Sequence, residues 1–129
     1  MSHILVIEDD QQMREMLKQM LQRAGYTALG AGDGREGMQI VREQVIDLII
    51  TDIIMPDQEG LETITQVRRE YPTIPVIAIS GGGRVEPENY LHSAKLLGAA
   101  HTFTKPLNRD EIMRVVTQLL AQRRGLGER

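Results

Sequence analysis

The sequence of 129 residues contains no cysteine. This absence excludes disulfide bonds, and it excludes a metal site or a catalytic nucleophile that depends on a thiolate. The sequence also lacks a charged leader followed by a long apolar stretch, and none of its apolar runs approaches membrane-spanning length. We therefore expect a cytoplasmic protein without membrane insertion.

Positive charge is not in excess, because 15 lysines and arginines stand against 18 aspartates and glutamates, for a formal net charge of −3. Modules built around nucleic-acid phosphates usually present a basic face. The charge balance therefore argues against direct binding of nucleic acid. The hydrophobic content of 41% and the chain length suit one soluble globular domain with a core of ordinary size.

Four short apolar runs end at residues that could handle a phosphate or a metal. Runs of this kind, separated by segments with helical periodicity, are typical of buried parallel strands joined by helices. The ligand site of an open α/β sheet lies beyond the carboxyl ends of its strands, so we expect these ends to converge on one crevice. The residues at the ends are Glu8, Asp9 and Asp10, then Asp52, then Ser80, and finally Lys105.

The whole chain alternates between strand-like and helix-like segments. Five such repeats without a long insertion predict an α/β, flavodoxin-like doubly wound (βα)5 fold, whose parallel five-stranded sheet has the order 2-1-3-4-5. Asn108 and Glu111 resemble a helix capping box, and Gly25 and Gly98 are placed to end helices. The predicted strands are 3–7, 27–30, 45–51, 75–80 and 100–104, and the predicted helices are 11–24, 35–43, 61–71, 91–97 and 108–122.

We divide the chain into one domain, 1–122, and a short C-terminal tail, 123–129. The tail contains two glycines and reads as a frayed end. It is too short to form a DNA-binding domain, so we expect no output domain. Pro56, Asp57 and Gly60 are assigned to a loop between the third strand and the next helix.

The chemistry of these residues suits phosphoryl transfer. Carboxylate oxygens are preferred ligands of a hard cation such as Mg²⁺, which keeps several waters and meets phosphate oxygens. A neighbouring carboxylate such as Asp52 can form an aspartyl-phosphate when a metal offsets the repulsion between the attacking group and the phosphodonor. A hydroxyl and an ammonium facing that carboxylate, those of Ser80 and Lys105, could then hold the phosphoryl oxygens.

Taken together, these motifs resemble the receiver domain of two-component response regulators. The likeness extends from His3 to Leu120, and it is carried by Glu8-Asp9, by the segment from Thr51 to Pro56, by Ser80 and by Lys105-Pro106. The resemblance implies that Asp52 is the phosphoacceptor and that Lys105 and Ser80 assist it. It also implies a metal site for Mg²⁺, with Mn²⁺ as an alternative ion, made by Glu8, Asp9, Asp52 and the backbone carbonyl of Ile54.

The same resemblance implies a response regulator in a two-component phosphorelay. Asp52 would accept a phosphoryl group from a phosphohistidine on a sensor histidine kinase or a histidine phosphotransfer protein. The protein would then change its affinity for a downstream protein target. Such a receiver is not a conventional enzyme, although it assists its own phosphorylation and dephosphorylation. It would act as a stand-alone unit, either as a monomer or as a phosphorylation-dependent dimer, and would contact partners through its last two helices and last strand.

Each residue also has a plainer interpretation. Asp52 could be a turn residue, Lys105 a surface lysine and Ser80 a turn hydroxyl. Glu8 and Asp9 could merely cap the following helix, a role that we assign to Asp10. Their joint occurrence favours the functional interpretation. The resemblance to receivers also implies that the Lys105-Pro106 peptide bond is cis, which would aim the lysine inward.

Three other classes fit the sequence less well. A haloacid-dehalogenase-like phosphatase would need a second aspartate where Ile54 stands, and the P-loop motif does not follow the first strand. Flavin binding would need a phosphate-cradling loop where the acidic residues lie. The remaining rival is an interaction module that keeps the fold but works without phosphorylation, and the intact acid set argues against it.

One departure from the receiver pattern concerns switching. The position three before Lys105, commonly aromatic in receivers, is Thr102. Phe103 and His101 should share the opposite face of their strand, Phe103 as a core residue. We hypothesise that motion of the loop that contains Gly81–Gly83, with the helix after it, replaces the aromatic switch.

A further departure concerns loss of the phosphoryl group, because neither Ile54 nor Gly82 can orient an attacking water. We expect dephosphorylation to be governed by the access of water. Ile54→Asn should therefore change the decay rate of the phosphorylated protein, measured by intact mass over time after the phosphodonor is removed. A decay rate equal to that of the wild type would contradict this expectation.

Overall fold

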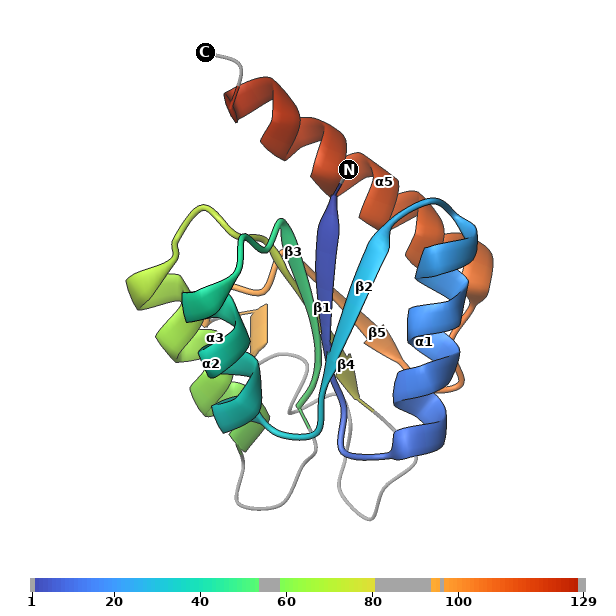
Figure 1. The fold of residues 1–129 in the computed structure, drawn as a ribbon, viewed down its shortest axis with the longest axis horizontal. Coiled ribbons are helices and arrows are strands. Elements are labelled where there is room, and N and C mark those ends of the chain that lie inside the picture. Colours follow the sequence, from blue (N-terminus) through green and yellow to red (C-terminus); the bar gives the residue numbers. More distant parts are fainter. Residues whose placement is uncertain (1, 54–58, 81–93, 96, 128–129) are drawn as a thin grey trace.

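A single parallel sheet lies at the centre of the molecule (Figure 1). The computed structural model describes residues 2–53, 59–80, 94–95 and 97–127, and of residues 59 and 124–127 only the backbone. Five strands pair in the order β2-β1-β3-β4-β5, which confirms the predicted fold class. The strands are β1 (His3–Ile7), β2 (Thr27–Ala31), β3 (Leu48–Asp52), β4 (Val76–Ser80) and β5 (His101–Thr104).

Helices cover both faces of this sheet, as Figure 1 shows. One face is covered by α1 and α5, and the other by α2 and α3. The described residues include the helices α1 (Gln11–Arg23), α2 (Gly34–Glu43), α3 (Glu59–Glu70) and α5 (Arg109–Gly127). Of the helix predicted at 91–97, Ala94 and Lys95 are helical, and most of the rest lies outside the described residues.

The core consists of two clusters because successive side chains of a strand point to opposite faces. On β1, Ile4 and Val6 pack with α1 and α5, whereas Leu5 and Ile7 pack with α2 and α3. All residues of β3 and β4 are buried, as expected for strands covered on both faces. This sandwich fixes the strands, and therefore their carboxyl ends, between two packed layers.

Most predicted element boundaries are confirmed within one or two residues, and among the strands the third differs most. It begins at Leu48 rather than at residue 45, and Val45 is 75% exposed outside the strand. Asp47 marks the change, because its carboxylate accepts a hydrogen bond of 2.8 Å from the backbone N–H of His3. The apolar, β-branched pattern of the sequence does not distinguish the strand itself from residues 45–47, which lead into it. Gly25 and Gly98 follow helices with φ values of 96° and 112°, as predicted.

The expectation of a frayed segment from Arg123 was wrong, because α5 continues to Gly127. Arg123 lies 3.6 Å from the Asp47 carboxylate, measured from Nε to Oδ1, and its guanidinium also donates to the backbone carbonyl of Thr73. These contacts fasten the last turns of α5 to the segments that lead into β3 and β4. Because these contacts are polar, the apolar stripe that predicted the helix gave no sign that the helix continues beyond residue 122. Among the described residues, no helix has the length and apolar character needed to span a membrane.

Arg123→Ala should lower the free energy of unfolding by about 1 kcal/mol, the typical worth of a partly exposed charge-assisted contact. The arginine and Asp47 side chains are each 26% exposed, so part of the effect should be screened by salt. Urea denaturation at low and high salt measures both quantities. Arg114→Ala, which removes an exposed arginine from the same helix, is the matched control. Equal stabilities of the two variants would contradict this role of Arg123.

Candidate functional site

The carboxyl ends of the strands meet at one edge of the sheet, the lower edge in Figure 1. The register pairs Ile7 with Thr51, Asp52 with Ile79, and Ser80 with Thr104. The last residues of four neighbouring strands therefore lie side by side. This parallel register confirms the expectation that the four apolar runs end at a common edge.

Three carboxylates gather at this edge. Glu8 and Asp9 follow β1 and Asp52 ends β3, and one oxygen of each lies within 4.8 Å of the others. Glu8 is 2% exposed and Asp52 is 5% exposed, whereas Asp9 is exposed. Oxygen atoms from several carboxylates at this spacing are a donor set that suits a hard divalent cation.

The ammonium of Lys105 lies between two of these carboxylates. Its Nζ donates to Glu8 Oε1 at 3.0 Å and to Asp52 Oδ2 at 3.1 Å. Burial lowers the pKa of Lys105, but the hydrogen bond to Glu8 and the charge of Asp52 outweigh burial, so the pKa is raised overall. Lys105 therefore stays protonated and holds the ends of β1 and β3 together. The Lys105–Pro106 peptide bond is cis, as the sequence resemblance implied.

Partial burial and the neighbouring carboxylate of Glu8 both act on Asp9. Its pKa is raised by burial first, and then by the hydrogen bond with Glu8 and the negative charge of that residue. A carboxylate in these surroundings resists ionisation more than one in water does. A divalent cation would offset the part of this penalty that comes from repulsion within the cluster.

Ser80 ends β4 with its hydroxyl in an unusual situation. The residue is fully buried, at 0% exposure, and its Oγ has no hydrogen-bond partner among the residues that the structure describes. Its backbone carbonyl accepts from the Lys105 N–H at 2.7 Å, which couples the end of β4 to the residue after β5. A buried hydroxyl that lacks a partner costs about 1–3 kcal/mol, so among the described residues Ser80 is the side chain with most to gain from a new hydrogen bond.

Asp10 has the capping role that the sequence predicted. Its Oδ1 accepts from the backbone N–H of Gln12 at 2.9 Å and of Met13 at 3.4 Å, so it caps α1. The other members of the acidic run, Glu8 and Asp9, belong instead to the carboxylate cluster. The structure thus separates one capping acid from two acids that face Asp52.

The structure describes some of the residues that the sequence linked to switching and dephosphorylation. Thr102 is half-buried on β5, and Phe103 packs against the core beside α1 and α5, as predicted. Exposed His101 stacks on Phe103 with ring centroids 5.5 Å apart. Ile54 and Gly81–Gly83 lie outside the described residues, so the metal role of Ile54 and the loop hypothesis remain predictions.

Gly60 is a residue whose importance the sequence did not reveal. It was assigned to the loop, but it is the second residue of α3. A Cβ at this position would collide with the backbone at the end of β3, at the carbonyl oxygen of Asp52 and at Cα of Ile53, the residue after the strand. Only glycine lets α3 begin this close to the end of the strand that carries Asp52. Glycine is common in loops, so its presence alone did not indicate a helix packed against a strand.

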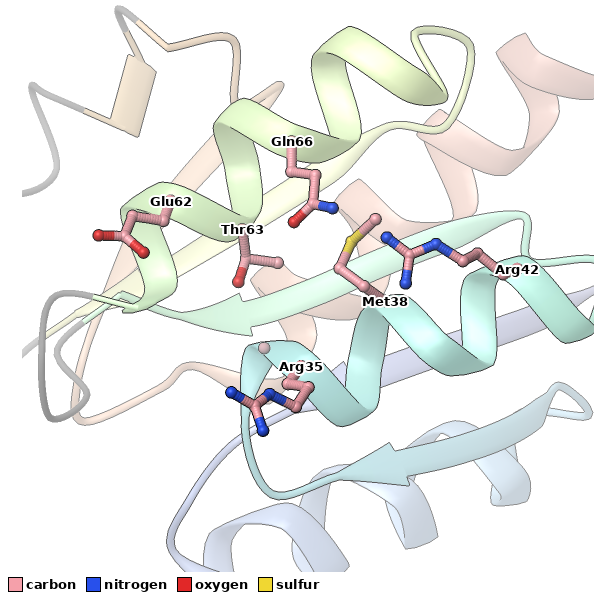
Figure 2. Close-up of a pocket in the computed structure, with 7 residues that line it drawn as sticks. Arg35, Met38, Arg42, Glu62, Thr63 and Gln66 are labelled. Atoms are coloured by element: carbon pink, nitrogen blue, oxygen red, sulfur yellow. The ribbon is translucent and has the colours of Figure 1, made fainter.

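A separate cavity of about 250 Å³ lies between α2 and α3 (Figure 2). Both arginines that line it come from α2, and Thr63 on α3 is buried. None of the clustered carboxylates lines this cavity, so it is distinct from the candidate metal site. Its labelled lining residues are Arg35, Met38 and Arg42 on α2 and Glu62, Thr63 and Gln66 on α3.

Comparison with known families adds an independent observation. The model of the response regulator receiver domain matches residues 4–117. The chain belongs to this family. The receiver fold therefore spans nearly all of the described structure, and the carboxylate cluster lies at the strand ends of a receiver domain.

Similar proteins of known sequence include transcriptional regulatory proteins. The receiver is 34% identical over 117 residues to the transcriptional regulatory protein YrkP of Bacillus subtilis, covering 90% of this chain and 48% of that protein. It is 32% identical to ZraR of Escherichia coli, covering 92% of this chain and 26% of that protein. The chain thus spans about half or less of the length of these relatives.

Solved structures of receiver domains have the same architecture. A receiver domain protein from Clostridium thermocellum matches with a TM-score of 0.88 and 26% identity, over 98% of this chain and 99% of that one. A CheY-like receiver domain protein from Methanospirillum hungatei matches with a TM-score of 0.83 and 25% identity, over 97% and 98% of the two chains.

Gly60→Ala should destabilise this receiver by about 1–3 kcal/mol, the usual cost of forcing an extra methyl group into a closely packed site. Alanine in an ordinary helical position would instead stabilise the helix by up to about 1 kcal/mol. Chemical denaturation therefore distinguishes close packing from helix propensity by the sign of the change. Gly32→Ala is the control, because a Cβ there would meet its nearest neighbour at an ordinary 3.6 Å. A stability of Gly60→Ala equal to or above that of the wild type would contradict the close approach.

Proposed function

We propose that this receiver accepts a phosphoryl group on Asp52 from the phosphohistidine of a sensor histidine kinase or a histidine phosphotransfer protein. The observation that supports the proposal best is the convergence of Asp52, Glu8 and Asp9 with the Lys105 ammonium at one strand edge. The Asp52 carboxylate therefore has two kinds of neighbour. The carboxylates of Glu8 and Asp9 can help to bind a metal, and the Lys105 ammonium can donate hydrogen bonds to phosphoryl oxygens.

Glu8, Asp9, Asp52 and the backbone carbonyl of Ile54 would hold the metal. The first three supply carboxylate oxygens within 4.8 Å of one another, which fits a hard divalent ion. The carbonyl of Ile54 is included because of the resemblance to receivers. When bound, Mg²⁺, or Mn²⁺ in its place, would offset the repulsion between the Asp52 carboxylate and the phosphodonor.

In the proposed reaction, an oxygen of Asp52 attacks the phosphorus in line with the bond to the histidine nitrogen. A new P–O bond forms as the P–N bond breaks, and the imidazole leaves with the electron pair of that bond. Lys105 turns from its partner oxygens toward a phosphoryl oxygen, and the Ser80 hydroxyl donates to another. These residues act by position and charge, because the transition state spreads negative charge over the phosphoryl oxygens.

The product carries roughly one to two additional negative charges at a crowded edge of the sheet. The Lys105 ammonium and the Ser80 hydroxyl would then have new partners, and the elements that carry them would shift. The resulting output is a change in affinity for a downstream protein target. The relatives named above are transcriptional regulatory proteins, which supports a role in regulation. The formal net charge of −3 supports an action on a protein partner rather than on nucleic acid.

The setting proposed for this activity is the cytoplasm, with the chain as a monomer or as a dimer formed on phosphorylation. An interaction module that works without phosphorylation is the alternative. It would have no use for three clustered carboxylates, a bridging lysine and a buried hydroxyl without a partner among the described residues. The observed site therefore favours the phosphorylated receiver.

Intact mass after incubation with acetyl phosphate tests the proposal directly. The wild type should gain the mass of one phosphoryl group when Mg²⁺ is present and none when it is chelated. Asp52→Ala should gain no mass under either condition, because it lacks the attacking oxygen.

Asp110→Ala removes an exposed carboxylate in the first turn of α5 and should be labelled like the wild type. A folded wild type that gains no mass would overturn the proposal in favour of the interaction module. Labelling of Asp52→Ala would show that another residue accepts the phosphoryl group.

A further inference from the structure

Arg14 reaches from the first turn of α1 back to the residue that starts the acidic run. Its Nη1 donates to the backbone carbonyl of Glu8 at 2.7 Å, and the arginine is itself half-buried. Glu8 is 2% exposed, so its carbonyl lies where little water can replace this hydrogen bond. Loss of the guanidinium would leave a buried acceptor without this charged donor, which costs more than loss of an exposed contact.

The neighbouring strand leaves room for this side chain. A Cβ on Gly30 of β2 would lie 3.1 Å from Cδ of Arg14 and 3.0 Å from Cδ of Lys18, tighter than ordinary packing contacts. Glycine therefore lets both aliphatic stems lie flat across β2. Of these two neighbours on α1, Arg14 makes the contact with Glu8, whereas Lys18 lies 3.6 Å from Glu15.

The turn from β1 to α1 is also fastened at other points. The N–H of Glu8 donates to the carbonyl of Ala31 at 3.0 Å, and the N–H of Asp10 donates to Glu8 Oε2 at 3.2 Å. The N–H of Arg14 donates to the Asp10 carbonyl at 2.9 Å. Arg14 thus bonds to this turn through both its backbone and its side chain. The turn carries Glu8 and Asp9, two of the three clustered carboxylates.

We propose that Arg14 is a positioning residue for the metal site, because it fixes the Glu8 backbone and thereby aims the carboxylates of Glu8 and Asp9 toward Asp52. This inference rests on the metal site of the proposed function. Arg14 acts through the Glu8 carbonyl, and the carboxylate oxygens remain the metal ligands.

Removing Arg14 has two opposite expected effects on Mg²⁺ affinity, one from its charge and one from its hydrogen bond to Glu8. A positive charge near the cluster opposes the binding of a divalent cation, so its loss by itself would tighten binding. Loss of the hydrogen bond to the Glu8 carbonyl would let the carboxylates of Glu8 and Asp9 move, and so weaken Mg²⁺ binding. The direction of the change in Mg²⁺ affinity therefore tells the two effects apart.

Calorimetric titration with Mg²⁺ on the full chain tests the proposal. Arg14→Ala should bind Mg²⁺ about tenfold more weakly than the wild type, as is typical when a group that orients a metal ligand is removed. Arg14→Lys keeps the charge and one donor group, so its affinity should lie between those of Arg14→Ala and the wild type. Lys18→Ala, which removes the neighbouring positive charge and stem but no contact with Glu8, should bind Mg²⁺ at least as tightly as the wild type.

Hydrogen exchange in metal-free protein supplies a second readout. The amide of Asp10, bonded to Glu8 Oε2, should exchange faster in Arg14→Ala than in the wild type or in Lys18→Ala. If Arg14→Ala does not fold, Gly30→Ala takes its place, because it keeps the guanidinium but displaces its stem. Weaker Mg²⁺ binding by Gly30→Ala would support the proposal, and wild-type affinity would contradict it.

The outcomes separate this inference from the proposed function. A wild type that binds no Mg²⁺ would overturn both. A wild type that binds Mg²⁺, with unchanged or tighter binding by Arg14→Ala, would overturn the positioning role and leave the proposed function intact.

Discussion

The repulsion among three carboxylates at one edge of the sheet is the constraint on which the site depends. Two of them, Glu8 and Asp52, are almost fully buried, and burial strengthens every interaction between charges. Lys105 relieves part of the repulsion by bonding to both. A divalent ion and a phosphoryl group would redistribute the same charges. Lys105 is therefore the residue whose contacts the proposed ion and phosphoryl group would change first.

The fold supplies this arrangement through the parallel sheet. Consecutive parallel strands present their carboxyl ends to the same side, so residues more than forty positions apart in sequence, such as Glu8 and Asp52, become neighbours. Two glycines complete the arrangement by allowing close approach. Gly60 lets α3 begin against the end of β3, and Gly30 lets the stem of Arg14 cross β2. The absence of a side chain at these positions shapes the site as much as its charged groups do.

Sequence reasoning succeeded where a local pattern had one physical interpretation. The alternating apolar runs gave the five strands and their order, and the run from Glu8 to Asp10 gave both the acids that face Asp52 and the helix cap. It failed where the decisive contact was polar and distant. Val45 continued a β-branched pattern but is exposed, and Arg123 appeared to belong to a frayed end but pairs with Asp47. Neither outcome is encoded in the neighbouring residues.

The sequence by itself determined the fold class and the residues that could carry the chemistry, because hydrophobic periodicity and strand-end placement are local properties. Only the tertiary structure decided which groups touch. It put Lys105 on both Glu8 and Asp52, left the Ser80 hydroxyl without a partner among the described residues, and brought Arg14 to the Glu8 carbonyl. These contacts depend on how α1 and the strand ends pack together, because hydrogen bonds form only within a narrow range of distances. Sequence spacing sets no distance that fine.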